Sequence, residues 1–177
     1  TNNGTFSQTG GTLTMNGTGT LTSNANAINN FTTSGGGTIT LASATHTLAG
    51  NLNIGSTGLT AGTSTVVMTG ASKTIDGGGK TIYNLTISGN TTLQNTNLIA
   101  NNLVTVDPGI SFTLTGTVLR LAGGFCITHL ALNGTIDGTG RIDFLDGCFS
   151  FPATGTVNAG VRYLYDGTNS SQLLGIT

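Results

Sequence analysis

Three aspartates in the C-terminal third are the residues whose types and spacing are suited to chemistry: Asp137, Asp143 and Asp146. Three basic side chains lie near them in the sequence: Arg120, His129 and Arg141. Enzymes that cleave polysaccharides use carboxylates about 5 to 10 Å apart in a cleft. Asp146-Gly147, however, is a turn sequence. We therefore predict that the chain is not an enzyme, and that Asp137, Asp143, Asp146 and Arg141 form a binding face for glycans.

One of these aspartates belongs to a motif that occurs twice. Residues 74–80 (TIDGGGK) and 135–141 (TIDGTGR) share a strand end, an Asp-Gly pair and a following cation. Asp-Gly supplies the positive φ angles of a tight turn. We expect one corner used twice, with surface ion pairs between Asp76 and Lys80 and between Asp137 and Arg141.

Composition indicates the elements that must position these side chains. The chain has five Lys and Arg, six Asp and no Glu among 177 residues, so it lacks the usual material of helices. It has 29 glycines instead, with many Thr, Ser and Asn interleaved with Leu, Ile and Val. Thr, Ile and Val favour strands, and Gly and Asn favour corners. The composition predicts an all-β protein.

A five-residue pattern recurs along the chain: an apolar residue, any residue, an apolar residue, a polar residue and Gly. Its copies occupy residues 13–17, 66–70, 85–89, 112–116, 119–123 and 130–134. Each copy predicts a short strand that points two side chains inward and ends at a glycine corner.

A longer rhythm indicates the architecture. Four glycines separated by 53, 46 and 51 residues predict a period of about 50 residues, or two coils: Gly17, Gly70, Gly116 and Gly167. We predict a single domain, residues 1–177, that folds as a parallel β-helix (β-solenoid) of about seven coils. An antiparallel sandwich of short strands is the rival architecture.

The cysteines fit this expectation. Cys126 and Cys148 are 22 residues apart, close to one coil, and neighbouring coils lie about 4.8 Å apart, within the range of a disulfide. A disulfide is predicted, and two buried free thiols are the alternative. Neither His46 nor His129 has zinc-ligand spacing to the cysteines, so we predict no metal and no cofactor.

Alternating aromatic residues near the C-terminus are candidates for contacts at the solenoid end: Phe149, Phe151, Tyr163 and Tyr165. They either bind a neighbouring subunit or close the core of the last coil. Neither end of the sequence has a recognisable polar cap, and open ends favour head-to-tail stacking. A fragment of a longer array would give the same pattern.

Charge and hydropathy exclude two classes of partner. A net charge of −1 with five scattered cations gives no basic surface for nucleic acid. No apolar run approaches the roughly 18 residues that a membrane span needs. The expected partners are further copies of the chain and, as the alternative, glycans.

Three segments resemble the β-strand-repeat surface proteins of bacteria, long adhesin-like chains similar to filamentous haemagglutinin: residues 2–6 (NNGTF), 11–18 (GTLTMNGT) and 83–89 (YNLTISG). The likeness covers the repeat-rich part, residues 1–124, and weakens in residues 125–151, which read as a disulfide-bearing insertion or specialised coils before a C-terminal coil at 152–177. The resemblance implies export, a right-handed β-helix and no catalytic residue. We predict a structural subunit of an extracellular filament or surface layer, with a glycan-binding module of an adhesin or phage-like fibre as the alternative.

Overall fold

The computed structural model describes residues 8, 10–23, 26–55, 57–123, 129–145 and 154–165, with the side chain of residue 165 left out. Every regular element in these ranges is a β-strand, and the strands form three sheets. The first sheet contains β1 (Thr12–Asn16), β3 (Asn30–Ser34), β6 (Leu52–Ile54), β9 (Lys73–Asp76), β11 (Thr91–Leu93), β13 (Ser111–Leu114), β16 (Thr135–Gly138) and β18 (Thr156–Val157).

The second sheet runs beside the first along the solenoid. It contains β5 (Thr45–Leu48), β8 (Thr65–Met68), β10 (Thr81–Ile87), β12 (Leu98–Val106), β14 (Val118–Leu121), β17 (Arg141–Phe144) and β19 (Arg162–Tyr165), with β15 (Leu130–Leu132) also paired to β12. The third, small sheet contains β2 (Gly19–Leu21), β4 (Thr38–Leu41) and β7 (Gly58–Thr60).

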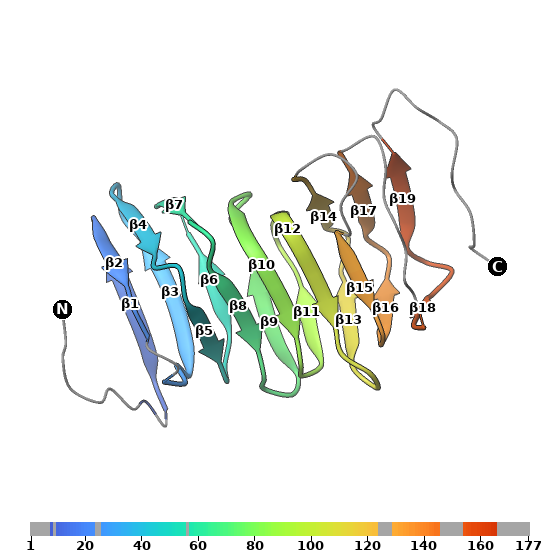
Figure 1. The fold of residues 1–177 in the computed structure, drawn as a ribbon, viewed down its shortest axis with the longest axis horizontal. Coiled ribbons are helices and arrows are strands. Elements are labelled where there is room, and N and C mark those ends of the chain that lie inside the picture. Colours follow the sequence, from blue (N-terminus) through green and yellow to red (C-terminus); the bar gives the residue numbers. More distant parts are fainter. Residues whose placement is uncertain are drawn as a thin grey trace.

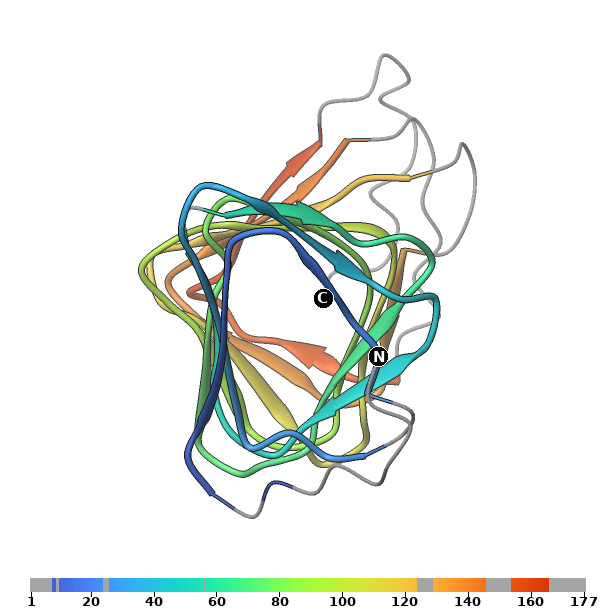
Figure 2. The same ribbon diagram turned by 90° about the vertical axis from the view of Figure 1, so that its left-hand side faces the viewer.

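The chain winds as a β-solenoid of about seven turns, which confirms the predicted fold class. Every pairing between named strands is parallel, as coils stacked on coils require and an antiparallel sandwich does not allow. Figure 1 shows the strands following one another along the long axis, with β1 and β19 at opposite ends. Seen along that axis, the coils surround one shared interior (Figure 2).

All six copies of the five-residue pattern form strands, as predicted. In β10, for example, Leu85 and Ile87 are fully buried, whereas Thr86 between them faces outward. This alternation follows from the period of two residues along a strand. The pattern therefore identified the inward-facing positions correctly.

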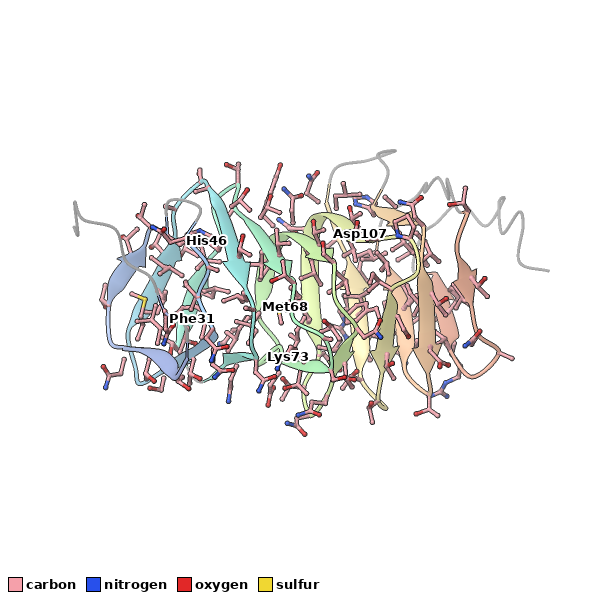
Figure 3. All side chains as sticks on the ribbon, turned by 90° about the horizontal axis from the view of Figure 1, so that it is seen from below. Phe31, His46, Met68, Lys73 and Asp107 are labelled. Carbon is pink, nitrogen blue, oxygen red and sulfur yellow. The ribbon has the colours of Figure 1, made fainter. Side chains whose placement is uncertain are left out.

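Register keeps like side chains above one another in the interior. In the first sheet Phe31 pairs with Leu52, Leu52 with Ile75 and Ile75 with Leu93. In the second sheet Met68 pairs with Ile87. Figure 3 labels Phe31 and Met68, which are 3% and 0% exposed. The result is one apolar core that is continuous along the axis.

Side-chain amides join successive coils on the outer surface of the first sheet. The Asn30 Oδ1 accepts a hydrogen bond from the Asn51 backbone N–H at 2.8 Å. Asn51 Oδ1 in turn accepts one from the backbone N–H of Thr74 at 3.0 Å. Three coils are thereby linked by amides at corners, where backbone groups lack a ladder partner. The abundance of Asn has this structural cause.

The predicted 50-residue rhythm is wrong as a coil period. Strand partners lie between 18 residues apart (Leu13 and Phe31) and 24 residues apart (Leu114 and Gly138). Gly17 and Gly116 follow strands of the first sheet, whereas Gly70 follows β8 of the second. Because both sheets use the same five-residue pattern, counting its glycines mixes two faces of the coil.

Some glycines are required by the close approach of neighbouring coils. A Cβ at Gly70 would lie 2.0 Å from the carbonyl oxygen of Ala49, and a Cβ at Gly89 would lie 2.5 Å from the carbonyl oxygen of Gly70. These three residues therefore stack at one corner of successive coils, where only the absence of a side chain allows the spacing.

The two TIDG motifs do not occupy equivalent positions. Both lie in the first sheet, but the ladder pairs Asp137 with Thr113, and through Thr92 with Thr74 rather than Asp76. The shared sequence is therefore displaced by two residues in register. Between residues 125 and 151, the strands β15, β16 and β17 continue the regular pairing.

Candidate functional site

The side chains best placed for binding lie on the outer face of β14, β17 and β19. Leu119 and Ile142 point into the core, and alternation therefore sends Arg120 and Asp143 outward. Register places Arg120 directly opposite Asp143, although 23 residues separate them in the sequence. The solenoid thereby brings together charges from separate coils.

Asp143 is the centre of this group. Its carboxylate is almost completely buried, with 2% of the residue exposed, although it faces outward. Arg141 donates from Nε to Oδ1 and from Nη2 to Oδ2, the latter at 2.9 Å. The Arg120 Nε lies 3.5 Å from Oδ2. Two guanidinium groups therefore compensate the desolvation of one carboxylate.

The hydrogen bond to Asp143 also acts on Arg141, because it raises the pKa of that guanidinium. Arg141 stays charged in any case, so the consequence is geometric. A two-point contact fixes the plane of the guanidinium, which a single contact would leave free to rotate. Arg141 is thus held by its partner in one orientation.

A third arginine extends the cluster. Arg162 of β19 is exposed and lies directly opposite Arg141 on the neighbouring strand. Like charges at directly opposed positions destabilise a sheet. Within the described ranges, Arg162 has no ion-pair partner. Three of the chain's five cations therefore share one face with one described carboxylate.

Asp137 lies elsewhere. It belongs to β16 of the first sheet, whereas Arg141 and Asp143 belong to the second. Its hydrogen bonds with the Asn158 side chain and with the backbone N–H of Gly138 lower the pKa of Asp137. The expected ion pair of Asp137 with Arg141 is wrong, because Arg141 pairs with Asp143.

Asp76 also has a structural role. Its carboxylate accepts hydrogen bonds from the Thr96 hydroxyl and from Asn95 Nδ2, the latter at 3.1 Å, both one coil later. The expected ion pair of Asp76 with Lys80 does not form, although both residues are described. The Asp-Gly corner is thus held by neutral donors from the next coil.

Tyr163 answers one of the alternatives left open by the sequence. Its ring stacks on Phe144, with centroids 6.5 Å apart and an interplanar angle of 16°. It packs against the core, and burial raises the pKa of its hydroxyl. Tyr163 therefore helps to close the last described coil. The side chain of Tyr165 is not described.

The remaining predicted site residues lie outside the described ranges: Cys126, Asp146, Cys148, Phe149 and Phe151. The disulfide and the contacts of the two phenylalanines stay predictions.

Sequence reasoning missed a buried Ser–His pair. His46 is 1% exposed, and its Nδ1 lies 3.0 Å from the hydroxyl of Ser23. Its Nε2 lies 3.0 Å from the Ala42 carbonyl, which can only accept, so Nε2 carries the proton. Burial lowers the pKa of His46. The ring lines a small cavity with otherwise apolar walls, so the pair satisfies a core histidine.

No protein-family model, curated protein or solved structure matches the chain. The likeness to bacterial β-strand-repeat surface proteins therefore stays a prediction. Within the described residues, no three His, Cys, Asp or Glu side chains are grouped so as to hold a metal ion. The same ranges contain no helix of the length and hydropathy needed to cross a bilayer.

Proposed function

We propose that the chain is a structural subunit of an extracellular filament or surface layer, in which solenoids stack end to end. One observation carries this proposal. All strands of the described solenoid run parallel in a stacked register, so each end coil presents a strand edge that a similar coil can extend. Such edges are templates for pairing with another chain.

At the N-terminal end the template is β1. The backbone N–H of Asn30 donates to the Gly11 carbonyl, and the N–H of Gly17 donates to Ser34, so Gly11 and Gly17 face β3. In a parallel strand, successive residues point their backbone groups to opposite sides. Thr12, Thr14 and Asn16 therefore direct their N–H and C=O groups away from β3. No described strand pairs with that side.

The C-terminal template is β19. The backbone N–H of Arg162 donates to the Gly140 carbonyl of the preceding coil. By the same alternation, the backbone groups of Tyr163 face away from β17, and no described strand covers them. The two templates have the same strand direction, so they are compatible with head-to-tail addition, a contact that repeats without closing.

The described carboxylates support a structural role over a catalytic one. Asp107 accepts a hydrogen bond from the Ser88 hydroxyl at 2.6 Å, one coil away. Asp76, Asp137 and Asp143 are likewise held by neighbouring donors. Each thus strengthens a turn or a contact between coils, and the proposal assigns no catalytic residue.

Electron microscopy combined with sedimentation tests the proposal. About seven coils spaced about 4.8 Å apart predict filaments with a rise of about 34 Å per subunit. Thr14→Pro removes a backbone N–H that points away from β3, and edge positions tolerate proline. We expect this variant to fold but to assemble poorly.

Thr14→Ser is the matched control, because it keeps the backbone donor and should assemble like the parent chain. A parent chain that stays monomeric at high concentration would contradict end-to-end assembly. Unchanged filaments from folded Thr14→Pro would show that β1 is not the contact.

A further inference from the structure

We propose that the outer face of β14, β17 and β19 binds an acidic polysaccharide. The guanidinium groups of Arg120, Arg141 and Arg162 would contact its carboxylate, sulfate or phosphate groups. This binding does not require filament assembly, since all three arginines belong to one chain. We call this surface the arginine face.

The first support is the imbalance of charge. Asp143 neutralises one of the three guanidinium groups, which leaves an excess of two positive charges among these four residues. Arg141 and Arg162 lie opposite each other on neighbouring strands, an arrangement that costs stability unless an anion lies between them. A chain with five cations in total is expected to spread them apart.

Hydrogen-bonding capacity is the second support. Arg141 uses Nε and Nη2 on Asp143, so Nη1 is still available to a ligand. The side chain of Arg120 is 43% exposed and that of Arg141 is 34% exposed. Guanidinium groups bind carboxylate, sulfate and phosphate in the same planar, two-point manner. The face therefore recognises the anionic group.

Preorganisation is the third support. Asp143 is buried and holds Arg141 from below, so it is a positioning residue that contacts no ligand itself. The three arginines project from paired strands of a sheet, whose spacing is fixed by the backbone ladder. A ligand would lose little free energy in ordering these side chains.

The shape of the surface favours a polymer over a small molecule. Register produces two outward rows along the solenoid axis: Val118, Arg141 and Arg162, and beside it Ile99, Arg120, Asp143 and Leu164. Leu164 is 45% exposed, and an apolar side chain can pack on the face of a sugar ring. Rows parallel to the axis suit an extended chain that carries charges at intervals.

Binding can be measured with immobilised polymers: alginate for carboxylate, dextran sulfate for sulfate, and dextran as the neutral polysaccharide. Poly-glutamate presents carboxylates without sugar, and inorganic polyphosphate presents phosphate without sugar. We expect one of the acidic polysaccharides to bind more tightly than dextran, poly-glutamate and polyphosphate, with an affinity that falls as salt rises.

Arg162→Gln removes an exposed charge without disturbing the buried carboxylate. We expect it to weaken binding about fivefold, and the double variant with Arg120→Gln to weaken it further. Lys73→Gln is the matched control, because it removes a cation from β9 in the other large sheet. It should change the affinity less than about twofold, and circular dichroism should show all variants folded.

Several results would overturn the proposal. Equal binding of dextran would show that charge is not recognised. Poly-glutamate or polyphosphate binding as tightly as the acidic polysaccharides would remove the glycan from the assignment. Equal losses from Arg162→Gln and Lys73→Gln would show that net charge, and not the arginine face, governs binding.

Discussion

Gly70→Ala and Gly36→Ala make the same chemical change at two glycines with different surroundings. A Cβ added at Gly70 would lie 2.0 Å from the carbonyl oxygen of Ala49, far inside contact distance. Around Gly36 no atom lies within 4 Å of the built Cβ, and its φ is not in the left-handed region. Opposite effects on stability are therefore expected.

The cost at Gly70 can be worked from its neighbours. Overpacking of a tight site costs about 1–3 kcal/mol. Pushing β5 and β8 apart also weakens the hydrogen bonds that Thr69 donates to the Leu48 carbonyl, from its N–H at 2.8 Å and its hydroxyl at 3.2 Å. Including those bonds, we expect a loss of about 2–4 kcal/mol in the free energy of unfolding. Gly36→Ala should gain about 0.4–1 kcal/mol, because it restricts the unfolded chain.

Thermal unfolding followed by far-ultraviolet circular dichroism measures both effects. For a chain of this length, the loss at Gly70 corresponds to a fall in Tm of about 5–15 °C. Gly36→Ala should leave the Tm unchanged or raise it slightly. If Gly70→Ala melted at the same temperature as the parent chain, close stacking at this corner would not be the reason for glycine.

Four further predictions concern stability and covalent structure. Because burial lowers the pKa of His46 below 6.5, the unfolded state takes up the extra proton, and stability should decline as the pH falls below about 6.5; His46→Gln should flatten this dependence in urea titrations. Phe112→Ala should cost about 3–5 kcal/mol in the same titrations, since Phe112 is fully buried. Asp143→Asn should lower the Tm more than Arg120→Gln, because it leaves Arg141 without its two-point partner. Mass spectrometry of a non-reduced digest should recover a peptide pair joined by Cys126 and Cys148, and two alkylated thiols would contradict the disulfide.

The strands were predictable because their signal is local. An apolar residue at every second position decides which side chains are buried, and this needs no knowledge of distant parts of the chain. The coil length was not predictable in the same way. Corners between strands differ in length, so partners such as Leu13 and Phe31 or Leu114 and Gly138 are separated by unequal numbers of residues. A glycine count cannot recover that variation.

The candidate site divides along the same line. Arg141 and Asp143 are two residues apart in a strand, so their shared face follows directly from the sequence. The addition of Arg120 and Arg162 depends on register between coils, which the unequal corners hide. Asp137 was grouped with Asp143 because they are near in sequence, but the corner at Gly140 separates them into different sheets.

His46 shows a signal that was present but unused. It occupies the second position of the segment Thr45–Leu48, in which Leu48 faces inward and Thr47 outward. Alternation therefore predicts that His46 faces the core, where an imidazole needs hydrogen-bond partners. Ser23 and the Ala42 carbonyl supply them. The identity of those partners depended on the coil register and on the corner geometry.

An end-to-end filament would repeat the arginine face once per subunit, at the rise of about 34 Å expected for seven coils. A long acidic polysaccharide could then contact several subunits at once, and each further contact would be intramolecular. Modest affinity at one face is enough for tight binding under those conditions. Because the remaining described surface is nearly free of charge, the arginine faces would be the main electrostatic attachment points along such a filament. This arrangement would let a fibre coat or cross-link an acidic matrix while its neutral surfaces pack against one another.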